Sequence, residues 1–120
     1  MASLKRLAAF LIALMWFASP SLAETRVALV IGNSAYKHAP ALANPKNDAE
    51  GMAAALKRLK FEVVLGVDLD EAATRRILRE FAEKLEGFGK EDVAVLFYAG
   101  HGLQVGGRNY LVPIDAKLEK

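Results

Sequence analysis

Short, almost uninterrupted apolar runs alternate along this chain with longer stretches whose apolar residues recur every three or four positions. Residues 26–31 and 92–98 are the clearest runs, and residues 61–67 form a predicted strand between them. A continuous apolar run of this length is typical of a strand buried on both faces of a parallel sheet. The alternation therefore predicts β-α-β units and an α/β fold with a mainly parallel sheet, in which we expect the strand at residues 92–98 to be central.

Two amphipathic helices are predicted between these strands. The first has Asn44 as its N-cap and Pro45 at its first helical position, and it runs to about Leu59. The second begins after Asp70, which serves as its N-cap. The apolar residues expected to pack on the sheet are Ala49, Met52, Ala53, Leu56 and Leu59 in the first helix, and Ala73, Ile77, Leu78, Phe81 and Leu85 in the second.

A small hairpin is predicted near the C-terminus, where residues 103–105 and 110–112 flank Gly106 and Gly107. Three strands and two helices make a thin domain. A central third strand needs a neighbour on each side, and these residues do not supply the second one. We therefore expect the chain to hold an incomplete portion of a larger sheet.

The N-terminal segment, residues 1–23, is interpreted as a signal peptide. Two basic residues precede the apolar run 7–18, which is too short to cross a bilayer as a stable helix, and residues 21–23 supply a small-x-small cleavage pattern. Cleavage is expected before Glu24, with export to a periplasmic or extracellular compartment and no stable membrane span left afterwards. An uncleaved anchor or a buried helix is the alternative.

The balance of charged residues argues against a nucleic-acid partner, and the small number of ligand-forming residues argues against a metal ion. Two of the 16 basic residues lie in the N-terminal segment, which leaves 14 against 14 acidic ones, so we expect no nucleic-acid partner. With two histidines and no cysteine, the chain cannot build a conventional zinc site without relying on carboxylates. We predict no metal and no cofactor, and we interpret Asp68, Asp70 and Glu71 as capping residues of the second helix.

The chemistry is expected directly after the third strand, where His101 stands between Gly100 and Gly102. Functional groups of parallel α/β sheets gather at the carboxyl ends of the strands. We expect an exposed, unshielded imidazole and a Gly102 N–H that is free to donate, an arrangement that suits a general base beside an oxyanion site. The alternative is a turn histidine whose glycines serve only the backbone. Tyr36 and Tyr98 are interpreted as packing residues.

Four segments together resemble the N-terminal half of the caspase-like (caspase-haemoglobinase) fold. They are residues 27–33, the Asn-Asp-Ala sequence at 47–49, residues 93–102, and residues 109–116. The chain is most similar to the bacterial caspase-like and metacaspase proteins of peptidase clan CD. This resemblance implies a three-layer α-β-α domain over residues 24–120 and a cysteine-type endopeptidase that acts on protein or peptide substrates through a His/Cys dyad.

The resemblance also implies roles for three residues. His101 matches the catalytic histidine, and Gly102 matches the glycine whose N–H helps to hold the oxyanion. Asp48 lies where metacaspase-like and paracaspase-like members place an acidic residue in the pocket for the P1 side chain, which implies cleavage after Arg or Lys. An acidic residue is also favoured in the first turn of any helix, which is the other explanation of Asp48.

The nucleophile is the departure from this family. The chain has no cysteine, and Ser34 lacks a nucleophile-elbow context, so we expect the 120 residues to be inactive alone. One hypothesis is an enzyme whose catalytic cysteine lies downstream of Ala116 or on a second chain. The other is a non-catalytic, degenerate or fragmentary relative that acts as an interaction module through its unpaired third strand.

Overall fold

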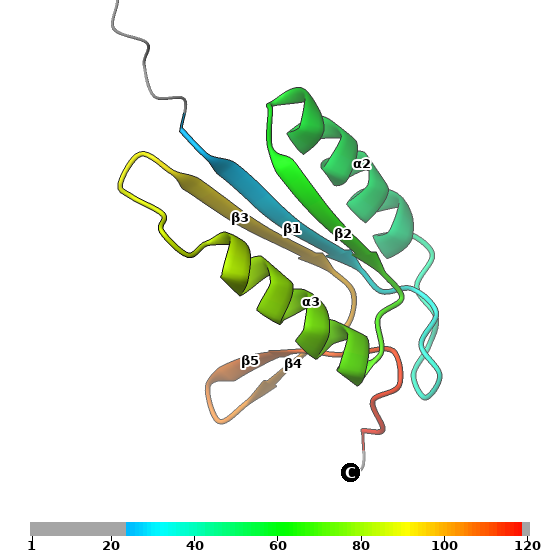
Figure 1. Cartoon of the computed structure of the whole chain (residues 1–120). Coiled ribbons are helices and arrows are strands. Elements are labelled where there is room, and N and C mark those ends of the chain that lie inside the picture. The colour runs from blue at the N-terminus through cyan, green and yellow to red at the C-terminus, as the bar shows by residue number, and fades with distance from the viewer. Residues whose placement is uncertain (1–23, 119–120) are drawn as a thin grey trace, which may run out of the picture.

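The computed structural model describes residues 24–118, and the predicted signal peptide therefore lies outside the described residues. Two helices and three parallel strands form the body of the molecule, and a separate hairpin leaves the carboxyl end of the third strand (Figure 1). The elements are β1 (Arg26–Gly32), α2 (Pro45–Arg58), β2 (Glu62–Val67), α3 (Glu71–Lys84), β3 (Val93–Ala99), β4 (Gly102–Val105) and β5 (Arg108–Leu111).

The main sheet has the order β2-β1-β3, and both pairings are parallel. In register, Ile31 of β1 lies between Gly66 of β2 and Tyr98 of β3. Among the described residues β1 is the central strand, and β3 has a neighbour on one side only, so the second neighbour that a central β3 needs is not among them. The apolar run that is buried on both faces is therefore the first one.

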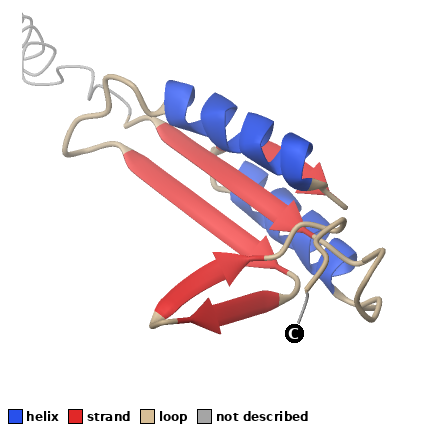
Figure 2. Ribbon diagram, turned by 90° about the horizontal axis from the view of Figure 1, so that it is seen from below, coloured by secondary structure: helices blue, strands red, loops and turns tan. Residues whose placement is uncertain are grey.

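Alternate residues of β1 face the two helices, which cover opposite faces of the sheet (Figure 2). One core cluster consists of Val27, Leu29, Ile31, Ile77 and Phe81, between β1 and α3. The other consists of Ala28, Val30, Ala49, Ala53 and Leu56, between β1 and α2. The predicted α-β-α layering is thus confirmed, and its cause is the period-two alternation of a strand between two apolar helix stripes.

The β3 strand is less buried than its composition predicts. Val95 and Phe97 pack toward α2, but Leu96 points to the other face and is 52% exposed. That face is open because α3 lies against β1 and β2.

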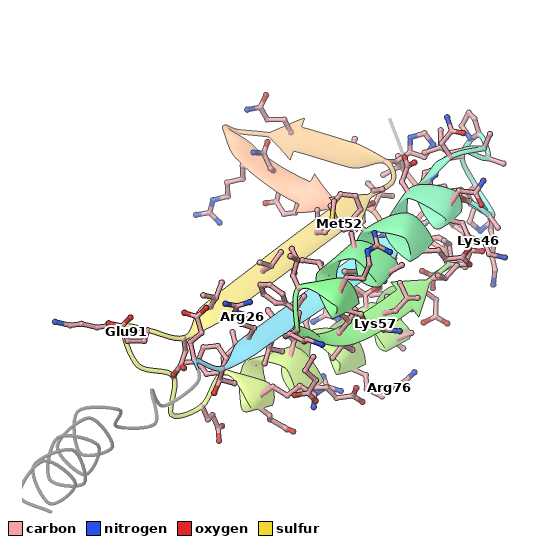
Figure 3. The ribbon with its side chains drawn as sticks, turned by 90° about the horizontal axis from the view of Figure 1, so that it is seen from above. Arg26, Lys46, Met52, Lys57, Arg76 and Glu91 are labelled. Atoms are coloured by element: carbon pink, nitrogen blue, oxygen red, sulfur yellow. The ribbon has the colours of Figure 1, made fainter. Side chains whose placement is uncertain are left out.

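Three helix positions predicted to be buried, Met52, Leu59 and Leu78, are also exposed. Figure 3 shows Met52 on the side of α2 that faces β3.

The two helices begin in different ways. Asp70 caps α3 as predicted, because its carboxylate accepts a hydrogen bond from the Ala73 N–H at 2.7 Å. Asn44 occupies the N-cap position of α2, but its side chain makes no capping hydrogen bond. The Ser34 hydroxyl accepts from the Lys46 N–H at 3.0 Å instead, which joins the start of α2 to the loop after β1. Sequence reasoning missed this cap because its donor and acceptor are distant in the chain.

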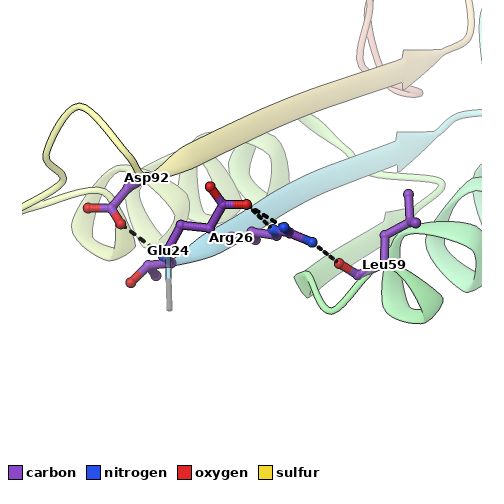
Figure 4. Close-up of polar contacts among 5 residues, drawn as sticks. Glu24, Arg26, Leu59 and Asp92 are labelled. Carbon is purple, nitrogen blue, oxygen red and sulfur yellow. Dashed lines mark hydrogen bonds and ion pairs between the residues drawn. The ribbon is translucent and has the colours of Figure 1, made fainter. Parts of the chain in front are cut away.

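Polar contacts tie the strands together at the end of the sheet where β1 and β3 begin (Figure 4). The Thr25 N–H donates to the Asp92 carboxylate at 2.8 Å, and the Arg26 guanidinium binds both Glu24 and the Leu59 carbonyl. Hydrogen bonds from the backbone N–H groups of Gly89 and Thr25 lower the pKa of Asp92. These contacts hold β1 beside β3 at the end opposite the candidate site.

Among residues 24–118, no helix is both long enough and apolar enough to cross a membrane.

Candidate active site

The candidate site lies at the carboxyl ends of the parallel strands, where Asn33 follows β1. This side chain is 2% exposed, and both its amide oxygen and its amide nitrogen form hydrogen bonds. Its Oδ1 accepts from the Leu69 N–H at 2.9 Å, its Nδ2 donates to the Val112 carbonyl at 3.3 Å, and its own N–H donates to the Ala99 carbonyl at 2.9 Å. Asn33 therefore joins the ends of all three strands to the segment after β5.

The loop between β1 and α2 is fastened at both sides. The N–H groups of Ser34 and Ala35 donate to the Asp68 carboxylate at 2.8 and 2.9 Å, and Lys37 N–H donates to the Ile114 carbonyl at 2.8 Å. Asp68 thus anchors this loop, and the prediction that it caps α3 was wrong. The Ser34 hydroxyl is engaged at the start of α2, as described above.

Glu71, also predicted as a cap, lies in the first turn of α3, and its N–H donates to the Asp115 carboxylate at 2.9 Å. The Ile114 N–H donates to the Leu69 carbonyl at 2.9 Å. The segment after β5 therefore fastens the start of α3 as well as the loop after β1. Three separate parts of the chain are held around the position of His101.

The imidazole of His101 is shielded rather than free. Its Nε2 lies 2.8 Å from the Pro40 carbonyl oxygen, and its ring centroid lies 4.5 Å from that of Tyr36, at an interplanar angle of 59°. A carbonyl oxygen only accepts hydrogen bonds, so Nε2 carries the proton and the neutral ring keeps its lone pair on Nδ1. The expected unshielded imidazole is thus corrected: the loop after β1 binds one nitrogen and orients the other.

Two tyrosine hydroxyls hold the backbone of His101. Tyr36 Oη accepts from the His101 N–H at 2.8 Å, and Tyr98 Oη donates to the His101 carbonyl at 2.6 Å. The two hydroxyl oxygens are 3.1 Å apart. Burial is the main cause that raises the pKa of Tyr98 above its usual range, and the hydrogen bond with the Tyr36 hydroxyl raises this pKa further. The interpretation of both tyrosines as packing residues was therefore incomplete, and the only sequence signal was their place near the ends of β1 and β3.

Gly102 begins β4, and the hairpin register determines where its N–H points. Hydrogen-bonded and non-hydrogen-bonded pairs alternate along antiparallel strands, and the Val112 N–H donates to the His101 carbonyl. The adjacent Gly102–Leu111 pair is consequently non-hydrogen-bonded, so the Gly102 N–H points away from β5. Gly102 also lines a surface cavity of about 380 Å³, together with Gly100, Gln104 and residues of β5.

The predicted hairpin is confirmed, with a two-residue turn at Gly106 and Gly107. Both glycines have positive φ angles, 55° and 77°, as such turns require. The turn fixes the register of β4 on β5, and the register sets the direction of the Gly102 N–H. A local turn signal thereby controls the orientation of a candidate site group.

Asp48 lies apart from this cluster. It is exposed in the first turn of α2, and within the described residues no hydrogen bond or ion pair joins its side chain to His101 or Gly102. Figure 3 labels Lys46 at the same end of α2, with Glu91 at the far end of the sheet. Asp48 therefore shares an end of the molecule with the site.

Residues 24–118 contain no group of three or more His, Asp or Glu side chains that could hold a metal ion.

A sequence model of the caspase domain matches residues 25–120. The chain belongs to the caspase-domain family. This membership confirms the predicted resemblance and the caspase-like α/β fold, of which the parallel sheet and its two helix layers are described above.

Two curated mammalian proteins are similar to this caspase-domain chain. Over 95 residues it is 39% identical to the human mucosa-associated lymphoid tissue lymphoma translocation protein 1, and 38% identical to its mouse homolog. The aligned part is 79% of this chain and 11% of each relative. Family membership shows that this chain carries a caspase domain, and the bacterial subclass stays a prediction.

Proposed function

We propose that this chain supplies the histidine-bearing part of a cysteine-type endopeptidase. The observation that carries the proposal is the His101 imidazole, whose Nε2 is held on the Pro40 carbonyl beside an N–H of Gly102 that is not used in the hairpin. Family membership supports a cysteine as the nucleophile. Because the 120 residues contain no cysteine, this thiolate belongs to polypeptide outside them, and the chain alone is inactive.

In the proposed reaction, Nδ1 of His101 acts first as the acid and then as the base. The thiolate attacks the scissile carbonyl carbon, and the Gly102 N–H donates to the oxyanion that forms. The departing amine takes a proton from Nδ1 of the His101 imidazolium as the C–N bond breaks, which leaves an acyl-enzyme and a neutral ring. Water then attacks the acyl carbon, gives its proton to Nδ1, and the thiolate leaves. The Pro40 carbonyl stabilises the imidazolium by accepting its Nε2–H throughout.

We also propose Asp48 as the recognition group for an Arg or Lys side chain at P1. Its carboxylate is exposed at the end of α2 that adjoins the site, where it is accessible to a cationic substrate. The domain is proposed to span residues 24–120 after removal of a signal peptide at residues 1–23, with the mature protein in a periplasmic or extracellular compartment.

The second candidate function is a non-catalytic interaction module. The β3 edge favours it, since this strand has no neighbour on its outer side among the described residues and Leu96 is half exposed. An open edge of this kind pairs readily with a strand of a partner.

A thiol-reactive probe that carries an arginyl peptide separates the two candidates. The protein produced by its own cells is labelled with this probe, and its intact mass is measured by mass spectrometry. The enzyme hypothesis predicts one label on a species heavier than 13.0 kDa, the mass of the 120 residues. Labelling should be lost in His101→Ala and kept in His38→Ala, which removes the other histidine.

Two results would count against the proposal. An unlabelled species no heavier than 13.0 kDa would favour the interaction module. Labelling that survives His101→Ala would remove this histidine from the dyad. For Asp48, the variant Asp48→Asn should reduce labelling by arginyl probes while leaving a small, thiol-selective reagent unaffected, and equal loss with both reagents would contradict a role in P1 recognition.

A further inference from the structure

The Tyr36 side chain contacts both the ring and the backbone of His101. Its own ring packs on the imidazole at 4.5 Å, and its hydroxyl accepts the His101 N–H at 2.8 Å. The residue is 8% exposed, so the hydroxyl is desolvated where it makes these contacts. A single aromatic side chain thus constrains the position and the tilt of the imidazole together.

The hydroxyl of Tyr36 is in turn held by groups from other elements. It donates to the Val112 carbonyl at 3.1 Å, and Tyr98 Oη lies within 3.2 Å of the same carbonyl and 2.6 Å from that of His101. Asn33 Nδ2 also donates to the Val112 oxygen. These contacts connect the loop after β1, the end of β3 and the segment after β5 to one histidine.

Gly100 leaves the space that the two hydroxyls occupy. A Cβ at this position would lie 2.6 Å from both Tyr36 Oη and Tyr98 Oη. No side chain fits there without displacing the hydroxyls. The first glycine beside His101 is therefore explained by the tyrosine pair, whereas the second, Gly102, belongs to the hairpin.

We propose that Tyr36 and Tyr98 are positioning residues, whose hydroxyls keep the His101 ring in the tautomer with the proton on Nε2 and the lone pair on Nδ1. This inference rests on the proposed function, because only a dyad histidine needs that lone pair directed to a substrate. The mechanism is geometric: the hydroxyls fix the His101 backbone, and the fixed backbone keeps Nε2 within reach of the Pro40 carbonyl. If the backbone moves, the Nε2–H loses its acceptor and the other tautomer becomes competitive.

The test is the tautomer of His101 in the full 120-residue chain, read from the ¹⁵N shifts of the imidazole at about pH 9, where imidazoles are neutral. The chain has two histidines, so His38→Gln assigns the signals. Tyr36→Phe keeps the ring and removes the hydroxyl, and Tyr98→Phe removes its partner. The matched control is Tyr110→Phe, which removes the hydroxyl of the third tyrosine, a half-exposed residue of β5.

The expected result is a predominant Nε2–H form in the unmodified chain and in Tyr110→Phe. In Tyr36→Phe the ratio of the two tautomers should fall about fivefold, the factor that corresponds to one ordinary hydrogen bond, and Tyr98→Phe should shift it in the same direction. An unchanged ratio in a folded Tyr36→Phe would overturn the proposal. If that variant loses its dispersed spectrum, Tyr98→Phe decides by the same criterion. Because the readout needs no peptidase activity, its failure is distinct from a failure of the dyad assignment.

Discussion

Replacing Gly32 by alanine tests how closely α2 approaches the end of β1. A Cβ at Gly32 would lie 2.5 Å from the Pro45 carbonyl oxygen and 2.6 Å from the Cβ of Ala49. Both neighbours are fixed, one as backbone and the other as a buried helix residue, so neither can rotate away. The added methyl must push the first turn of α2 off the sheet.

The magnitude follows from two opposing effects. Overpacking of a rigid contact costs about 1–3 kcal/mol. Loss of glycine freedom in the unfolded chain offsets about 0.4–1 kcal/mol of this cost. We therefore expect Gly32→Ala to lower the free energy of unfolding by about 1–2 kcal/mol.

Gly51 is the matched control, because it lies inside α2 and a Cβ there would meet no atom within 4 Å. Gly51→Ala should raise the free energy of unfolding by about 0.5–1 kcal/mol, the difference in helix propensity. The assay is urea unfolding of the full chain followed by circular dichroism. With a urea slope of about 1 kcal/mol/M, the two variants should differ in midpoint by about 2 M. A Gly32→Ala midpoint equal to that of the unmodified chain, with an unchanged slope, would refute the close approach.

Three further predictions concern capping and pH. Asp70→Ala removes the α3 cap and should lower the free energy of unfolding by about 1 kcal/mol in the same assay, and an unchanged midpoint would contradict the capping role. The carboxyl pKa of Asp92 is lowered from 3.8 by the N–H groups of Gly89 and Thr25, so the stabilisation is present above pH 3.8 and is lost as the pH falls further. The midpoint difference between the unmodified chain and Asp92→Asn should therefore shrink below pH 3.8, and a constant difference would oppose this reasoning. Burial raises the pKa of Tyr98 above its ordinary 10.0, so this residue favours folding below pH 10.0 and the effect is lost as the pH rises. Above pH 10.0, the urea midpoint of Tyr98→Phe should therefore fall less with pH than the midpoint of the unmodified chain. Equal falls in the two proteins would contradict the raised pKa.

The secondary structure could be predicted well where the signal was local. Three local signals each predicted the structure of the short segment that contains them, and each prediction was confirmed. They are the apolar run at β1, the Asp70 cap and the paired glycines of the hairpin. The place of β3 could not be obtained in this way. Its apolar composition indicates how buried a strand can become, while its actual burial depends on which elements cover it.

The candidate site also combines features that the sequence predicted with contacts that it did not. The position of His101 after a parallel strand, with a glycine on each side, could be found in the sequence, as could the family to which the chain belongs. The contacts that orient this histidine could not, because Pro40, Tyr36 and Val112 are separated from it by 61, 65 and 11 residues, by difference of residue numbers. No local pattern records a hydrogen bond between such distant groups.

The amino-acid sequence by itself determined the family, the α/β class and the position of the candidate histidine after a parallel strand, because periodicity, caps, turns and motifs act over a few neighbouring positions. Only the tertiary structure decided that β1 is central, that a carbonyl of the loop after β1 takes the Nε2 proton, and that two tyrosines hold the histidine backbone. The physical reason is that parallel strands bring their carboxyl ends to one edge of the sheet, where loops from distant parts of the chain first meet.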